Sequence, residues 1–178
     1  MNNELAFLRK RRTIRKFTAE DISEQHIEAL LDAASIAPSR LDRRPLHYVL
    51  IRDQGLKAKL AEALRVRPYI EQAPVVMAVC ADPSVSTTWE LDASAAIENI
   101  LLAATALGLG AAWVGSKGSQ MWEQAVDTLH TAAGVPAGIV VASLVCIGHP
   151  NEEKPPYGPG EKMNWQRVHL DRWDNIRM

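Results

Sequence analysis

The chain has 178 residues, of which 47% are apolar, and its 20 Lys and Arg residues are balanced by 21 Asp and Glu residues, giving a formal net charge of −1. This size and composition predict one globular domain over residues 1–178, and the balanced charge argues against nucleic acid or another polyanion as a partner. The N-terminus is polar and the apolar runs are interrupted by Gly, Ser or Asn, so we expect neither a signal peptide nor a membrane span, and a cytoplasmic protein.

Apolar periodicity, caps and breakers divide the chain into helices and strands, with helices predominating. Ser23 is a good N-cap for a helix that has to end before Pro38, and Pro74 opens a continuous apolar strand. The order predicts an α+β fold with a mixed central β-sheet flanked by helices. In chain order, we expect a short helix carrying Leu5, Phe7 and Leu8, a helix after Ser23, a strand at 46–51, a helix at 56–64, a strand at 75–80, a helix at about 89–107, a strand at 111–115, a helix at 121–132 and a strand at 138–147.

The expected helix at 89–107 is apolar almost all round. Such a helix is buried on several sides, which in a chain of this size suggests contact with a second subunit. Beyond the last strand, prolines and glycines between Pro155 and Gly160 prevent regular structure, and Trp165 and Trp173 follow. This arm needs an apolar surface to dock on, either on its own subunit or on a partner.

The two cysteines, Cys80 and Cys146, each lie in an apolar run that reads as a strand. They have neither Cys-x-x-Cys spacing nor a nearby histidine, and the five histidines are scattered. We interpret the cysteines as small core residues in a reducing compartment, and we expect no metal site.

Three arginines and a threonine lie within five residues, in the segment Arg11–Arg15. Guanidinium groups match phosphate oxygens two at a time, so this segment can form a site for one phosphorylated small molecule. It can equally be a solvated basic helix end, because Arg9, Lys10 and Lys16 flank it. A nucleic-acid surface is disfavoured, since no second basic stripe follows.

Four motifs occur in order along the chain: Arg-Arg-Thr-Ile-Arg at 11–15, Ala-Pro-Ser at 37–39, Gly-Leu-Gly-Ala-Ala-Trp-Val-Gly at 108–115 and Gly-His-Pro at 148–150. No single motif is decisive, but the ordered set covers nearly the whole chain and resembles the nitroreductase family of FMN-dependent oxidoreductases. The resemblance implies a homodimer that binds FMN at its subunit interface and uses NAD(P)H as electron donor. It also implies that residues 150–178 form an extended C-terminal arm exchanged with the partner.

The resemblance assigns the phosphate of FMN to Arg11, Thr13 and a late basic residue. Lys162 is the first candidate for that late residue, and Arg167 is the alternative. Arg12 would contribute main-chain or ribityl contacts.

Other matching residues would face the flavin ring. By the resemblance, Arg15 supplies a cation at the pyrimidine edge, where it stabilises the reduced anion. A loop from the second subunit, with Pro38, Ser39 and Arg40, would lie along the ring. The backbone at Val114 and Gly115 would approach the N5 atom of the flavin.

The chain departs from the family after Pro38-Ser39. Asp42, Arg44 and Leu46 stand where the family often has Asn, Gln and Trp. Either Asp42 and Arg44 pair and the site is kept, or the pocket is tuned to another substrate. An ionised Asp42 can accept a hydrogen bond from flavin N3–H but cannot donate one.

The resemblance implies a ping-pong transfer of two electrons from NAD(P)H through FMN to nitroaromatics, quinones or similar flat acceptors, with no side chain required as a catalytic acid or base. The spacer between Gly55 and Pro74 is short, so we expect an open site. Two alternatives stay open: a flavin-binding or storage protein without useful turnover, and a flavin enzyme of another type, such as flavin fragmentation or reductive dehalogenation.

Overall fold

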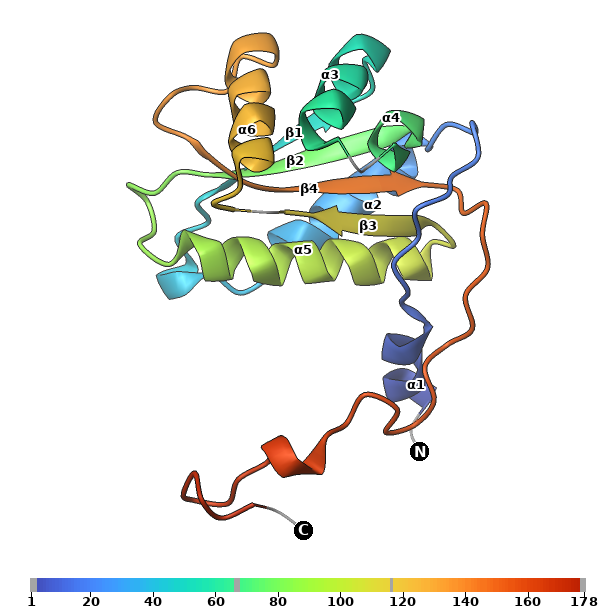
Figure 1. Ribbon diagram of the computed structural model, residues 1–178, viewed down its shortest axis with the longest axis vertical. Coiled ribbons are helices and arrows are strands. Elements are labelled where there is room, and N and C mark those ends of the chain that lie inside the picture. Colours follow the sequence, from blue (N-terminus) through green and yellow to red (C-terminus); the bar gives the residue numbers. More distant parts are fainter. Residues whose placement is uncertain (1–2, 66–67, 116, 177–178) are drawn as a thin grey trace.

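The computed structural model describes residues 3–65, 68–115 and 117–176, and it confirms the α+β fold. A four-stranded sheet lies between two layers of helices, with strand order β1-β2-β4-β3 (Figure 1). The strands are β1 (Leu46–Ile51), β2 (Val75–Ala81), β3 (Gly110–Val114) and β4 (Val140–Gly148). The helices are α1 (Asn3–Lys10), α2 (Glu24–Ser35), α3 (Gln54–Leu64), α4 (Tyr69–Gln72), α5 (Trp89–Ala106) and α6 (Gln120–Ala132), and short 3-10 turns cover Arg40–Asp42 and Trp165–Arg167.

The boundaries differ from the expected ones by one or two residues at several ends. Gly115 follows β3 rather than ending it, and Gly138 precedes β4, where Ile139 N–H closes a turn onto the Pro136 carbonyl at 2.9 Å. The expected N-cap is confirmed, because the Ser23 hydroxyl accepts a hydrogen bond from the His26 N–H at 3.2 Å. Helix α4 was not expected, since one turn is too short to produce an apolar period.

All four strands pair antiparallel. The parallel component of the expected mixed sheet is therefore confined to one isolated bridge, between Thr13 and Ala111. This bridge attaches the basic N-terminal segment to β3, which is the edge strand of the sheet. The open edge of β3 is thus the part of the sheet closest to the candidate site.

Strand β2 is buried along its whole length, and its side chains alternate between two cores. Val75, Met77 and Val79 belong to the core under α2 and α5. The intervening side chains, including Cys80, belong to the core under α3 and α6. Cys80 and Cys146 are both buried, as expected, and burial raises the pKa of the Cys80 thiol to about 11.

The N-terminal segment and the chain after β4 run side by side along one flank of the sheet (Figure 1). Three backbone hydrogen bonds join them: Thr18 N–H to the His149 carbonyl at 2.9 Å, Asn151 N–H to Lys16 at 2.8 Å and Tyr157 N–H to Arg9 at 3.0 Å. Farther along, the C-terminal arm leaves the body of the fold and ends well away from the sheet. Within the described residues, no helix is long and apolar enough to cross a membrane.

Candidate functional site

A glycine lets the basic N-terminal segment lie against the edge of β3. The N–H of Ile14 donates to the Ala111 carbonyl at 3.0 Å, and the Ile14 side chain is buried over Gly110. A Cβ at residue 110 would lie 2.7 Å from Cγ2 and 2.8 Å from Cβ of Ile14, closer than packed atoms approach. Gly110 therefore fixes where the arginines of this segment can lie, a role that sequence reasoning missed.

The three arginines of the segment point to different partners. Arg11 Nε lies 3.2 Å from Glu98 Oε1 on α5, and its side chain is about a quarter exposed (28%). Arg12 donates to the Pro155 carbonyl and its guanidinium lies 4.2 Å from the ring centre of Tyr157. The Arg15 guanidinium lies 5.8 Å from the ring centre of Tyr69.

A carboxylate and a lysine from the C-terminal side complete this cluster. Glu152 Oε1 accepts from the Arg15 N–H at 2.6 Å and the Lys16 N–H at 3.3 Å, and it lies 3.3 Å from Lys154 Nζ. Lys154 Nζ also donates to the Thr13 carbonyl at 2.5 Å. Hydrogen bonding from the Arg15 N–H, reinforced by Lys154, holds the pKa of the Glu152 carboxyl below its usual range.

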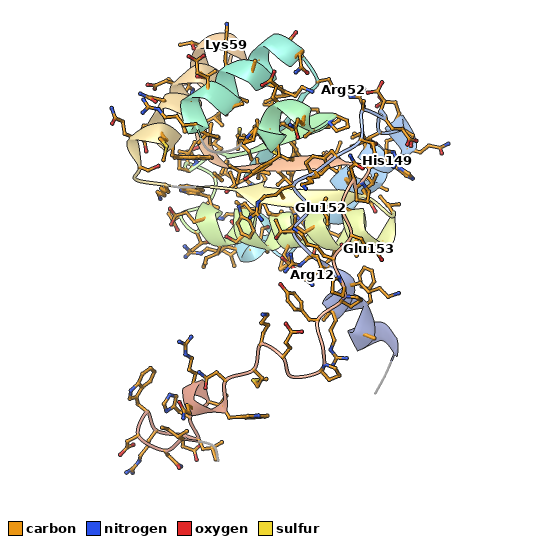
Figure 2. All side chains as sticks on the ribbon, turned by 45° about the vertical axis from the view of Figure 1, so that its right-hand side comes forward. Arg12, Arg52, Lys59, His149, Glu152 and Glu153 are labelled. Atoms are coloured by element: carbon orange, nitrogen blue, oxygen red, sulfur yellow. The ribbon has the colours of Figure 1, made fainter. Side chains whose placement is uncertain are left out.

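Lys154 is a candidate for the late basic residue of the phosphate site, and sequence reasoning overlooked it. Figure 2 labels Arg12, Glu152 and Glu153 in the region where the N-terminal and C-terminal segments run together. The available signal was a lysine six residues after the end of β4, between acidic residues and prolines. Its partner in the basic segment lies 141 residues away, so spacing could not reveal the contact.

The proposed late basic residues, Lys162 and Arg167, lie farther along the arm. Lys162 pairs with Glu161 at 3.2 Å and its ammonium lies 5.0 Å from the Tyr157 ring centre, across from Arg12. Arg167 lies in the short 3-10 turn beyond it. Of the three late basic residues, Lys154 is the one that bonds directly to the basic segment, through Thr13.

The backbone of β3 offers hydrogen-bonding groups at its open edge. The Ala111 carbonyl points outward to Ile14, and backbone groups of a strand alternate in direction. The same edge therefore carries the backbone groups of Trp113 and, continuing the alternation, Gly115, whereas those of Val114 point to β4. A Cβ at Gly115 would meet Ser143 Oγ at 3.1 Å, so a glycine suits this position.

The loop after α2 is held rigidly. The Arg40 N–H donates to the buried Asp92 carboxylate at 3.1 Å, and the Ser39 hydroxyl accepts from the Arg44 N–H at 3.2 Å. Pro38 is exposed beside them. In the described part of the chain, no hydrogen bond or ion pair joins this loop to the basic segment.

Asp42 and Arg44 do form a pair. Arg44 Nε and NH2 lie 2.6 and 2.5 Å from Asp42 Oδ1. Arg44 also donates to the Ser35 carbonyl and, at 3.0 Å, to the Ala37 carbonyl at the end of α2. Leu41, Asp42 and Arg44 all have left-handed backbones, with φ of 52°, 56° and 53°. The Arg44 bonds therefore hold together a strained loop whose tip, Leu41, is 76% exposed.

Among the described residues, no group of three His, Cys, Asp or Glu side chains is arranged to hold a metal ion. The chemistry of the site thus centres on the arginine segment, Lys154 and the edge of β3.

Comparisons with known proteins fit this geometry. The sequence model of the Nitroreductase family matches residues 8–84 and 67–149. The chain belongs to the nitroreductase family. A protein of Archaeoglobus fulgidus with the provisional name NADH dehydrogenase/NAD(P)H nitroreductase is 37% identical over 177 residues, covering 97% of this chain and 100% of its own.

Two solved members of the family are similar throughout. The FMN-dependent nitroreductase of Clostridium difficile R20291 has a TM-score of 0.87 and 27% identity, covering 94% of this chain and 99% of its own. A nitroreductase-like protein of Desulfovibrio desulfuricans, solved in complex with FMN, has a TM-score of 0.77 and 32% identity, covering 89% and 93%. This chain therefore has the family's fold over nearly its whole length.

Proposed function

We propose that this protein is an NAD(P)H-dependent FMN oxidoreductase that reduces nitroaromatics, quinones or similar flat acceptors by a ping-pong mechanism. The observation that carries the proposal is the basic segment held on the open edge of β3 by Gly110 and Ala111, in a chain of this family. FMN binds solved relatives of the same fold, and the donor set here has the chemistry that FMN requires.

The phosphate end of FMN needs cationic and hydroxyl donors, and this chain supplies them from both ends. Arg11, Arg12 and Thr13 lie on the N-terminal segment, and Lys154 reaches the same segment from the C-terminal side. The side chains of Arg11 and Lys154 are 28% and 27% exposed, so a phosphate can reach them while most of their surface stays packed. We assign the late basic role to Lys154 in preference to Lys162 or Arg167.

The ring end of FMN needs an N–H donor and flat contacts. Gly115 directly follows β3, where the absence of a Cβ permits close approach to the backbone, and Arg15 supplies a cation on the segment that bonds to β3 through Ile14. When bound, FMN accepts a hydride from the nicotinamide and passes two electrons to the acceptor. The chain's own residues bind and orient; none is required as an acid or base.

We further propose a homodimer in which the C-terminal arm packs on the partner. The arm extends away from its own sheet, and its Trp165 and Trp173 side chains are 50% and 84% exposed (Figure 1). On the body, Leu91 of α5 is also 71% exposed. Large apolar side chains on both surfaces favour mutual burial. The rigid loop at Pro38, Ser39 and Arg40 would then face the flavin of the other subunit.

An absorbance spectrum of the purified protein tests the cofactor, and anaerobic titration tests the reaction. We expect flavin bands, bleaching on addition of NADH or NADPH, and recovery of the oxidised spectrum when nitrobenzene or a quinone is added. Flavin that binds but is not bleached by either nicotinamide would indicate the alternative, a flavin-binding protein without turnover. Protein without flavin bands after reconstitution with FMN would refute the proposal.

A further inference from the structure

A cavity of about 370 Å³ opens beyond the ends of β3 and β4, between the start of α5 and helix α6. Small-molecule sites typically have about 300–1,000 Å³, so this cavity suits a molecule of one or two rings. It is lined by three tryptophans from different elements: Trp89 on α5, Trp113 on β3 and Trp122 on α6. Three indoles around one space favour a flat aromatic occupant.

Two polar groups of the cavity have hydrogen-bonding capacity left. The Ser143 hydroxyl, on a side chain that is 6% exposed, accepts from Trp113 Nε1 at 2.8 Å, and its own proton has no acceptor among the described residues. The indole N–H of Trp122 likewise makes no hydrogen bond within that part of the chain. Trp122 Nε1 is not among the buried atoms that lack a partner, so it retains some exposure, and donors that face a cavity favour an occupant with oxygen acceptors over a hydrocarbon.

In the described part of the chain, the lining of the cavity offers no unpaired cation. Lys117 pairs with Glu90, and its ammonium lies 5.1 Å from the ring centre of Trp89. His130 is bound through Nδ1 to the Val135 carbonyl at 2.7 Å. Glu123 also lines the cavity and forms no ion pair within the described residues, so the lining disfavours an anionic occupant.

The cavity adjoins the proposed reaction site. A shallower hollow lined by Gly115 shares Trp113, Lys117 and Ser143 with the cavity. The hollow lined by Gly115 and the aromatic cavity therefore lie next to each other at these side chains.

We propose that this cavity binds a neutral, flat aromatic acceptor bearing a nitro or carbonyl oxygen, with that oxygen accepting from the Ser143 hydroxyl. This inference rests on the proposed function, because it names the place and the class of the electron acceptor. It assigns the selectivity of the protein to the indole cage and to Ser143, residues that the sequence motifs did not single out.

The test uses the oxidised, FMN-loaded protein without nicotinamide, so that no turnover occurs. Nitrobenzene and toluene are matched probes, because they have similar size and differ in oxygen acceptors. Titrations are followed by the indole N–H signals in nitrogen-15 NMR spectra, of which the chain's five tryptophans provide five. We expect nitrobenzene to shift the signals of Trp113 and Trp122 and to leave those of Trp165 and Trp173 in place.

Two variants locate the contact. Ser94→Phe places a ring at the mouth of the cavity, and we expect the affinity for both probes to fall at least tenfold. Thr128→Phe, on the side of α6 that faces α3 and outside the cavity, is the matched control, because within the described residues each hydroxyl bonds only to the carbonyl four residues earlier, at 2.8 Å. Ser143→Ala should weaken nitrobenzene about three- to tenfold, the loss of one hydrogen bond, and leave toluene unchanged.

Nitrobenzene that binds equally well to Ser94→Phe, or that shifts only the arm tryptophans, would overturn the proposal. So would a loss of FMN instead of probe affinity in Ser94→Phe, because FMN would then occupy the cavity. Flavin content and bleaching by NAD(P)H are recorded on the same samples. If the wild type holds no flavin or its flavin is not bleached, the proposed function is refuted. If flavin is bound and bleached but the probes do not bind in the cavity, only this inference is refuted.

Discussion

Replacing Gly110 by Ala tests whether the packing of Ile14 positions the FMN site. The new Cβ would lie 2.7 Å from Ile14 Cγ2, so the N-terminal segment has to move away from β3 and weaken the 3.0 Å bond from Ile14 N–H to the Ala111 carbonyl. Overpacking of this kind costs about 1–3 kcal/mol, while removing a glycine from a strand returns roughly 0.5–1 kcal/mol. We expect a net destabilisation of about 0.5–2 kcal/mol and, because Arg11 moves with the segment, FMN binding about tenfold weaker.

Urea unfolding of the FMN-free protein and FMN titration measure the two effects separately. Gly138→Ala is the control, since a Cβ there would have no atom within 4 Å, and it should change stability by less than about 0.5 kcal/mol. An Ile14→Gly background removes both Cγ2 and Cβ of residue 14, so the cost of Gly110→Ala should disappear there and the two changes should couple by about 1 kcal/mol. Additive effects, or wild-type FMN affinity in Gly110→Ala, would show that this contact does not position the segment.

Three further outcomes follow from the contacts described. Arg11→Ala removes charge-assisted hydrogen bonds, so FMN should bind at least about tenfold more weakly while riboflavin, which has no phosphate, is unaffected in equilibrium titrations. Glu152→Gln should lower the free energy of unfolding by about 1–2 kcal/mol at pH 7. The folded-state pKa of Glu152 is depressed, so its contribution to stability is present above the unfolded value of 4.5 and is lost as pH falls through the folded pKa. The stabilities of variant and wild type should therefore converge in denaturation curves recorded at acid pH. A difference in stability that stays constant with pH would exclude a stabilising role for the Glu152 carboxylate. Deleting the chain from Pro155 onward should give insoluble or flavin-free protein, and a flavin-bound monomer in light scattering would contradict the shared site.

The elements predicted correctly from the sequence are those whose signal is local and repeated. Strand β2 is a continuous apolar run after a proline, and α5 is a long apolar helix, so both could be recognised without tertiary information. Helix α4 has only four residues, too few to show the apolar periodicity of a helix. The direction of strand pairing is a property of the assembled sheet: helices between strands permit either direction, and the order β1-β2-β4-β3 became apparent only in the structure.

The residues of the candidate site likewise divide into those that the sequence indicates and those that only the fold brings together. The arginines at 11–15 are close in sequence, so their chemistry was visible at once, whereas Lys154 and Glu152 reach them only because the chain after β4 pairs with the N-terminal segment. The choice of Lys162 as the basic residue from the C-terminal arm at the FMN phosphate relied on its distance along the arm. Such a distance does not determine which residue faces the site when the intervening prolines and glycines set an irregular path.

The Asp42–Arg44 pair shows how a departure from a family motif can have a local cause. An arginine stands where the family often has an amide, and the sequence left open whether it pairs with Asp42 or tunes the pocket to another substrate. In the structure the guanidinium binds Asp42 and the carbonyls of Ser35 and Ala37, at the C-terminal end of α2, where the helix dipole favours a cation. These bonds offset the cost of left-handed backbones at Leu41 and its neighbours, about 1 kcal/mol or more at each. The new charge is therefore neutralised within its own loop, and the loop presents an apolar tip, Leu41, to the outside.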